Sequence, residues 1–179
     1  MSNFIFDWDF SLLDFIQENM RTNFLDYLFV LLTSIGNYPN VWLLLTLPFL
    51  FFKKTRYYAI FILICYFSSK ILCDSIKNLV QRERPFSYFP DMQLLIKKPR
   101  SFSFPSSHSM QSFSFATSIF LINKKWGIPC LILAALIAFS RLYLYVHFPT
   151  DVLVGTLLGI LVPVTIYNLL KSKLKLSKS

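Results

Sequence analysis

The chain has 179 residues, a length that suits one domain, and 55% of them are hydrophobic while only 15% are charged. Together with a mean hydropathy of +0.53, this composition excludes an ordinary soluble domain and indicates a protein that sits in lipid. The formal net charge of +9 does not indicate nucleic-acid binding, because the basic residues fall in short clusters between apolar runs, as they do in membrane proteins.

The first predicted element is a helix over residues 3–20, where aromatic and aliphatic residues are interspersed with four acids. These acids make the segment too polar to span a membrane, so the pattern predicts an amphipathic helix at the membrane interface. The segment lacks the basic start and the small-residue cleavage site of a secretory signal peptide, and we expect it to remain in the mature protein.

Six apolar runs follow, at residues 24–35, 41–52, 57–79, 109–123, 127–146 and 152–170. A spanning helix needs about 20 residues to cross about 30 Å of hydrocarbon. We therefore predict an all-α integral membrane protein in which residues 24–170 form a bundle of six transmembrane helices. The first, second and fourth runs are short, so four or five spans remain alternatives. Residues 1–179 would then make one domain that ends in a basic cytoplasmic tail at residues 171–179.

The distribution of Lys and Arg predicts the orientation, because these residues accumulate in short cytoplasmic loops. With the N-terminus inside, the cytoplasmic set is Arg21, Lys53, Lys54, Arg56, Lys124, Lys125, Lys171, Lys173, Lys175 and Lys178. The exception is the outer segment 82–107, whose cations are Arg82, Arg84, Lys97, Lys98 and Arg100. Basic outer loops are unusual, so this segment is predicted to be functional.

The third run carries polar residues at steps of four, three, four and three, which draws one polar stripe along a helix that ends near Pro85. Its members are Lys70, Asp74, Lys77, Gln81 and Arg84. An ionisable residue in a span costs at least about 2.5 kcal/mol on insertion scales, so such residues normally face the bundle interior and mark a functional path. The alternative is a Lys70–Asp74 pair that only holds helices together.

Three segments far apart in sequence combine basic residues with histidine, and in this topology all three lie on the outer side. They run from Lys77 to Pro85, from Pro105 to His108, and from Ser140-Arg141 through His147 to Asp151. Lys77, Arg84 and Arg141 offer an ammonium and two guanidinium forks, which match the oxygens of a phosphate group. The sequence therefore predicts a phosphate-binding site.

The two histidines of the chain give this site its candidate chemistry. Pro105 and Ser106 predict a helix start with Ser106 as N-cap, where free backbone N–H groups favour an anion. His108 would lie in the first turn as a general acid, because the ordinary pKa of histidine is close to neutral. Asp151 lies four residues after His147, so its carboxylate can accept one imidazole N–H and leave the other nitrogen as a nucleophile. The alternative, histidines that only join helices, fits two histidines in basic motifs less well.

These segments resemble the type 2 phosphatidic acid phosphatase superfamily, whose signature is Lys, six residues, Arg-Pro, then Pro-Ser-Gly-His, then Ser-Arg, five residues, His, three residues, Asp. All spacings agree here, and the resemblance covers residues 24–170, but Ser107 stands where the family has Gly. The resemblance implies a phosphohistidine intermediate on His147, oriented by Asp151, with His108 protonating the leaving group and later activating water. It further implies no metal or other cofactor, and phosphate binding by Lys77, Arg84, Arg141, Ser106 and the backbone around Ser107.

The lipid that carries the phosphate is less sharply predicted. A minimal chain with an outward site resembles bacterial phosphatases of the cytoplasmic membrane that convert undecaprenyl diphosphate to undecaprenyl phosphate, and phosphatidylglycerophosphate, phosphatidic acid and lipid A 1-phosphate are the alternatives. In the loop 86–104, aromatic residues would enter the interface while cations contact a second phosphate, or the loop is simply solvated. The sequence indicates no oligomeric state.

A hypothesis of another class is a lipid-phosphate transporter whose transport path is lined by the polar stripe of the third run. A transporter needs cations, but it has no evident use for a histidine paired with a carboxylate. The pair of His147 and Asp151 therefore favours an enzyme.

Overall fold

The computed structural model describes residues 4–37 and 39–170, and within them the chain is helical and forms no strand. The α-helices are α1 (Phe4–Met20), α2 (Asn23–Asn37), α3 (Pro39–Thr46), α4 (Arg56–Val80), α5 (Ser107–Ile122), α6 (Lys124–Tyr143) and α7 (Pro149–Leu170), with 3-10 turns η1 (Leu47–Leu50) and η2 (Pro85–Tyr88). The all-α prediction is confirmed for this part of the chain.

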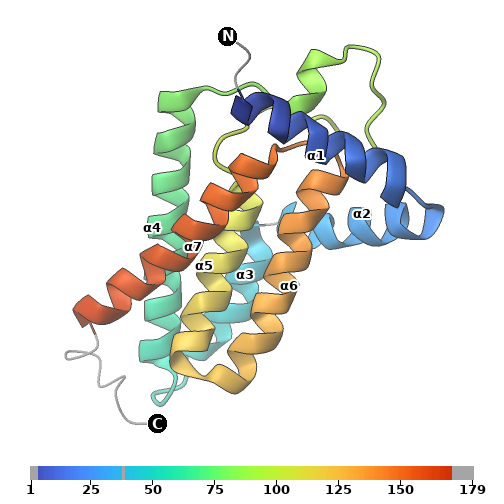
Figure 1. The fold of residues 1–179 in the computed structure, drawn as a ribbon. Coiled ribbons are helices and arrows are strands. Elements are labelled where there is room, and N and C mark those ends of the chain that lie inside the picture. The colour runs from blue at the N-terminus through green and yellow to red at the C-terminus, as the bar shows by residue number, and fades with distance from the viewer. Residues whose placement is uncertain (1–3, 38, 171–179) are drawn as a thin grey trace.

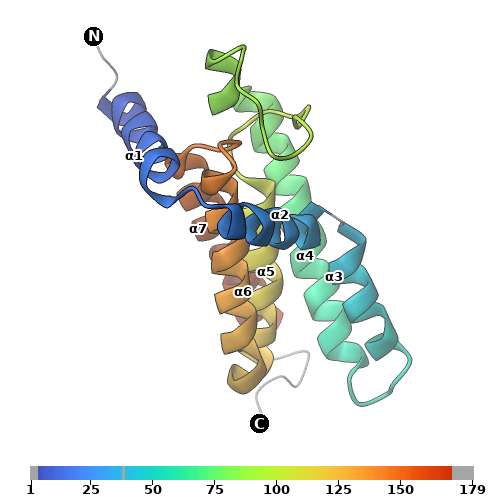
Figure 2. The same ribbon diagram turned by 90° about the vertical axis from the view of Figure 1, so that its right-hand side faces the viewer.

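Four helices, α4 to α7, form a bundle with α5 at its centre (Figure 1). α5 has its most extensive contacts with α6 and α7, followed by α4. Figure 2 shows α3 beside α4, and both views show α1 and α2 lying across the bundle rather than along it. The elements that carry the three predicted motifs, α4, α5 and the α6–α7 connection, thus belong to the central bundle.

Among the described residues, α4, α6 and α7 are long and apolar enough to cross a membrane. They correspond to the predicted runs 57–79, 127–146 and 152–170. The other three runs also form helices, namely α2, α3 with η1, and α5, but each is shorter than the roughly 20 residues that a simple span requires. The integral-membrane character is supported, and the count of six spans stays a prediction.

The position of α1 differs from the six-span topology, which places the N-terminus and the C-terminus at the same side. α1 contacts the α6–α7 connection, where Gln17 Nε2 donates a hydrogen bond to the carbonyl of Tyr143 at 2.8 Å. α7 begins beside α1 and runs to the opposite end of the bundle (Figure 1). The physical reason is the orientation of α2, which is about 23 Å long and lies across the bundle rather than along it (Figures 1 and 2). Arg21, expected among the cytoplasmic cations, directly follows α1, whereas Lys53 and Lys124 stand beside the starts of α4 and α6, at the end of the bundle away from α1 (Figure 1).

The polar stripe of the third run is only partly realised. α4 ends at Val80, where Gln81 adopts a left-handed conformation with φ of 50°, so Arg84 lies beyond the helix in extended backbone. Lys70 and Asp74 form an ion pair of 2.7 Å, but their side chains are 43% and 50% exposed. The pair does not line an interior path, and of the stripe residues on α4 only Lys77 is buried.

Two glycines allow α7 to approach α5 closely. A Cβ atom on Gly155 would lie 2.7 Å from the carbonyl oxygen of Ser106, and one on Gly159 would lie 2.5 Å from that of Met110. At this close approach the backbone N–H of Ser106 donates to the carbonyl of Asp151 at 3.0 Å. The second and third motifs are thereby joined through the first turns of the two helices.

Aromatic residues of the segment 86–104 pack against α1. The ring centroids of Tyr88 and Phe89 lie 5.6 and 5.9 Å from that of Phe10, and the ring of Phe10 lies 5.1 Å from that of Phe148. These edge-to-face contacts are favourable arrangements for aromatic pairs. The aromatic residues of the loop therefore hold α1 against the start of α7, a role that the sequence did not indicate.

Candidate active site

His147 lies in the short connection between α6 and α7. α6 ends at Tyr143, and Tyr145 adopts a left-handed conformation with φ of 57°. The backbone N–H of Val146 then turns back to the carbonyl of Arg141 at 3.2 Å. This turn directs His147 into the protein, where its side chain is almost completely buried.

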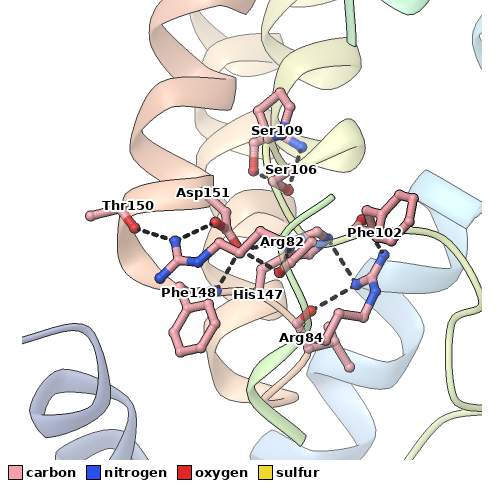
Figure 3. Close-up of polar contacts among 12 residues, drawn as sticks. Arg82, Arg84, Phe102, Ser106, Ser109, His147, Phe148, Thr150 and Asp151 are labelled. Atoms are coloured by element: carbon pink, nitrogen blue, oxygen red, sulfur yellow. Dashed lines mark hydrogen bonds and ion pairs between the residues drawn. The ribbon is translucent and has the colours of Figure 1, made fainter. Parts of the chain in front are cut away.

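Asp151, in the first turn of α7, faces the imidazole of His147. Its Oδ2 atom lies 3.5 Å from Nδ1 of His147 and accepts hydrogen bonds from Ser103 Oγ at 2.5 Å and from the N–H of Phe148 at 2.9 Å (Figure 3). An ionised carboxylate only accepts hydrogen bonds, so this contact favours the tautomer with the proton on Nδ1. The Nε2 atom is then unprotonated. Ser103, which the sequence reading did not select, lies between the two residues, 3.4 Å from Nδ1.

Arg84 fixes the other side of the imidazole. Its Nη1 atom lies 3.1 Å from Nε2 of His147 and also donates to the carbonyl of Val146 at 2.7 Å. Its Nε donates to the carbonyl of Ser101 at 2.7 Å. Because arginine can only donate, Nε2 must act as acceptor in this contact. Arg84 and Asp151 thus favour the same tautomer from opposite sides of the ring.

The surroundings of His147 lower its pKa well below the ordinary value of 6.5. Burial is the largest cause, and the positive charges of Arg84, Arg141 and Lys77 act in the same direction. Both effects disfavour the protonated, charged ring. At neutral pH the imidazole is therefore neutral, which is the form that can attack an electrophile.

A cavity of about 560 Å³ opens in front of His147. It is lined by Arg84, Ile96, Lys97, Lys98, Pro99, Arg100, Ser101, Ser107, His108, Arg141 and His147. Five of the eight predicted site residues, from all three motifs, are among these lining residues. The convergence expected from sequence is present in the structure, and the cavity is bordered by cations from several elements.

The remaining predicted residues lie behind the cavity wall. Lys77 donates from Nζ to the carbonyls of Phe102 at 2.5 Å and Ser103 at 3.2 Å. Ser106 is the N-cap of α5, as predicted, and its Oγ accepts from the N–H of Ser109 at 3.4 Å. Neither Lys77 nor Ser106 lines the cavity, so their direct contact with phosphate stays a prediction. Asp151 does not line it either, but it contacts His147, which does.

Arg141, at the end of α6, is 1% exposed and borders the cavity. Its Nη1 donates to the hydroxyl of Thr33 on α2, a contact that sequence reasoning missed. Its Nε atom has no hydrogen-bond partner among the residues that the structure describes. Buried donors are nearly always paired, so a substrate oxygen is a natural acceptor for this guanidinium.

Arg82 and Asp9 lie close to His147 and Asp151, although the sequence did not predict either of them as a site residue. The sequence places Arg82 in the predicted outer basic segment and Asp9 in the predicted interfacial helix. In the structure Arg82 Nη1 donates to Asp151 Oδ1 at 2.7 Å, and its Nη2 donates to Asp9 Oδ2 at 2.7 Å. The position of Arg82 between Lys77 and Arg84 was an available signal, but nothing local identified Asp9.

Comparison with known proteins places these motifs in a family. A model described as the PAP2 superfamily matches residues 57–175. An undecaprenyl-diphosphatase of Sulfolobus acidocaldarius is 35% identical over 136 residues, which cover 75% of this chain and 66% of the relative. The chain spans less than two thirds of the length of the curated relatives that it matches.

Two solved structures have a similar fold. The crystal structure of a transmembrane PAP2 type phosphatidylglycerolphosphate phosphatase from Bacillus subtilis has a TM-score of 0.81 and 25% identity, over 96% of this chain and 89% of that one. The structure of LpxE from Aquifex aeolicus has a TM-score of 0.77 and 28% identity, over 89% and 94% of the two chains. The fold therefore matches membrane proteins of this family over nearly its whole length.

Proposed function

The chain belongs to the PAP2 superfamily, and on that basis we propose that it is a membrane lipid phosphatase in which His147 carries the transferred phosphate. The observation that carries this proposal is the contact of His147 Nε2 with Nη1 of Arg84, at the wall of a cavity that His108 and Arg141 also line. A neutral nucleophile, an acid–base candidate and fixed cations are the groups that phosphoryl transfer requires. Their convergence supports an enzyme over a transporter.

The proposed reaction has two steps. In the first, Nε2 of His147 forms a bond to phosphorus, and the bond from phosphorus to the leaving oxygen breaks with its electron pair going to that oxygen. His108 donates a proton to the leaving oxygen only where that oxygen requires one, because burial and the nearby positive charges of Arg141, Arg84 and Lys77 lower the pKa of His108 well below 6.5 and favour its neutral form. In the second, His108 takes a proton from water, the water oxygen attacks phosphorus, and the phosphorus–nitrogen bond breaks to release phosphate and neutral His147.

The roles of the remaining groups follow from charge. Phosphorylation makes the imidazole cationic, and the carboxylate of Asp151 at its Nδ1 side stabilises that charge. Arg84 and Arg141 donate to the equatorial oxygens of the transferred group, as do Lys77, Ser106 and the backbone at Ser107 in the predicted set. These side-chain cations supply the positive charge, so we propose that no metal is required.

We propose a diphosphate lipid, undecaprenyl diphosphate, as the preferred substrate. Lys97, Lys98 and Arg100 line the same cavity as His147, so when the terminal phosphate lies at His147 the second phosphate has cations beside it. Charge-assisted contacts of this kind are strong. The name of the Sulfolobus relative supports this substrate, while phosphatidylglycerophosphate, phosphatidic acid and lipid A 1-phosphate remain the alternatives.

The decisive experiment is to trap the intermediate. Purified protein in detergent is mixed with undecaprenyl diphosphate labelled in its terminal phosphate and quenched in alkali, in which phosphohistidine survives. We expect label on the wild-type protein and none on His147→Asn. Turnover by His147→Asn at the wild-type rate would contradict the role of His147, and absence of release from every lipid phosphate tested would contradict the phosphatase itself.

We further propose a bacterial cytoplasmic membrane location, with the active site outward and the C-terminus cytoplasmic. Lys53, Lys54, Lys124 and Lys125 stand beside the starts of α4 and α6, whereas the cavity residues Arg84 and Arg141 stand at the other ends of these helices. The positive-inside rule places the cytoplasm at the side of the four lysines. A cysteine at the exposed position Ser87 should react with an impermeant reagent on intact cells, and a cysteine at Lys124 only after lysis. The reverse pattern would invert the orientation.

The position of α1 supports an interfacial location at the outer side. Its exposed residues include Phe4, Ile5 and Phe15, while Leu13 and Ile16 are buried against the bundle. A helix with apolar residues on both its inner and its outer side fits between protein and acyl chains near the interface.

A further inference from the structure

One buried carboxylate attaches α1 to the start of α7. Asp9 is fully buried. Its Oδ1 accepts the backbone N–H of Thr150 at 3.0 Å, and its Oδ2 accepts the hydroxyl of Thr150 at 2.6 Å and Nη2 of Arg82 at 2.7 Å. A buried charge is retained only where it is paired and hydrogen-bonded, and these three contacts meet that requirement.

Arg82 joins this carboxylate to the one beside His147. Its Nη1 contacts Asp151 Oδ1 at 2.7 Å and Thr150 Oγ1 at 2.7 Å (Figure 3). The guanidinium carbon also lies 3.9 Å from the ring centroid of Phe148, a stacked arrangement that favours a cation. The planar fork of arginine is thus fixed on both of its ends and on one face.

The charges of this group explain why two carboxylates are present. Without Asp9, Arg82 would pair with Asp151 alone, and its positive charge would cancel the negative charge of Asp151. That negative charge is the one that stabilises the ring of His147 when the ring becomes cationic. With Asp9 present, Arg82 is shared, and one full negative charge remains on the pair of carboxylates. Phosphorylation of His147 then completes a neutral set of Asp9, Arg82, Asp151 and imidazolium.

We propose that Asp9 is a positioning residue for catalysis, which acts through Arg82 to hold Asp151 against His147 and to keep its charge available to the ring. The inference rests on the proposed phosphatase function. It makes α1, which precedes the residues that the family model matches, a part of the active site rather than only a membrane contact.

The test compares Asp9→Asn and Asp9→Ala with the wild-type chain in detergent, with kcat normalised to the folded fraction. We expect kcat to fall about 10- to 100-fold, by analogy with the loss that follows removal of the outer partner of a metal-binding side chain, with the larger loss for Ala. KM should change little, because substrate binding is left intact. A wild-type kcat in both variants would overturn the proposal.

Asp14→Asn is the matched control on the same helix. Asp14 Oδ1 accepts the hydroxyl of Tyr145 at 2.8 Å, so this variant weakens the attachment of α1 without touching Arg82. We expect it to retain kcat near the wild-type value. An equal loss of kcat in Asp14→Asn would show that only the docking of α1 matters and would overturn the role assigned to Asp9.

A double-mutant cycle tests whether Asp9 acts through Arg82. Asp9→Asn should cost much less in an Arg82→Gln background than in the wild-type chain, because residues in one network are not additive. Fully additive losses would overturn the proposal. If the wild-type chain releases no phosphate from any lipid, the proposed phosphatase function and the role of Asp9 are both refuted. Wild-type activity with unaffected Asp9 variants refutes the positioning role alone.

Discussion

Nη1 of Arg84 and Nε2 of His147 lie 3.1 Å apart, so the cation meets the nitrogen that faces the cavity. The same guanidinium is held by the carbonyls of Ser101 and Val146. Under the proposed function, a phosphate that approaches Nε2 enters the field of this fixed cation and replaces its contact with the ring. Arg84 would then both orient the proposed nucleophile, His147, and receive the negative charge of the phosphate.

The first prediction concerns the guanidinium group of Arg84. Arg84→Lys keeps the charge but has a single nitrogen, which cannot reach His147, Ser101 and Val146 together. We expect kcat/KM for phosphate release to fall about 100-fold or more, the loss that follows removal of one fixed donor at a developing negative charge. Wild-type kinetics in Arg84→Lys would show that charge alone is sufficient.

The second prediction concerns the ionisation of His147. Its pKa lies well below 6.5 because of burial and nearby cations, so the ring stays neutral at pH 6.5. The stability that this group contributes is full above pH 6.5 and is lost as the pH falls through its folded-state pKa. Arg84→Gln removes one cation and should raise the pKa of His147.

Ring NMR of protein labelled in its two histidines measures this directly, with His108→Asn to assign the signals. A midpoint for His147 at or above 6.5 in the wild-type chain would contradict the structure.

The third prediction concerns Asp151. Asp151→Asn places an amide beside Nδ1, and the amide can donate to this nitrogen and favour the opposite tautomer. By analogy with an orienting carboxylate in other histidine-based enzymes, kcat should fall about 10⁴-fold. Asp74→Asn, at a half-exposed position of α4, is the control and should keep the wild-type rate in the same phosphate-release assay. Comparable rates in both variants would argue against an orienting role for Asp151.

The fourth prediction concerns the contact between α5 and α7. A side chain at Gly155 would enter the space of the Ser106 carbonyl, so Gly155→Val should separate the first turns of the two helices. We expect a loss of about 1–3 kcal/mol in stability, as for other overpacked sites, and reduced activity. Thermal unfolding in detergent measures it, with Leu157→Ala on the exposed face of α7 as the control. A Gly155→Val protein as stable as this control would contradict the close packing.

The fifth prediction separates diphosphate from monophosphate substrates. The double variant Lys97→Met with Arg100→Gln should lower kcat/KM for undecaprenyl diphosphate by about tenfold or more, because each contact with a charged group contributes about 1.5–3 kcal/mol. The effect on phosphatidic acid should be much smaller. Lys124→Met with Lys125→Met, at the far end of the bundle, is the matched control. Equal losses for both lipids would remove the argument for a second-phosphate site.

Much of the catalytic centre could be predicted from sequence because it is encoded locally. His147 and Asp151 are four residues apart across a helix start, so their approach follows from helix geometry. Ser106 follows a proline and precedes a helical run, and it forms the predicted N-cap. The long apolar runs of α4, α6 and α7 also indicated helices of spanning length.

Other features depend on tertiary packing and left no local pattern. The spacing of three and four residues between Lys77, Gln81 and Arg84 is that of a continuous helix, but Gln81 adopts a left-handed conformation and α4 ends before it. The apolar residues of α2 satisfied the composition of a span, although the helix lies across the bundle. Asp9 looked like one of four acids on an amphipathic helix, and only the docking of α1 brings it to Arg82.

Lys77 holds the carbonyls of Phe102 and Ser103, and the N–H of Ser103 donates to the carbonyl of Arg82. The segment that bears Lys97, Lys98 and Arg100 is therefore anchored to the end of α4 at the residues just before α5. Under the proposed function, exchanges of the exposed cations Lys97, Lys98 and Arg100 can then alter which headgroup is accepted without moving His147. In evolutionary terms, recognition and reaction are separable here, and new substrate preferences can arise in this segment while the chemistry is inherited unchanged.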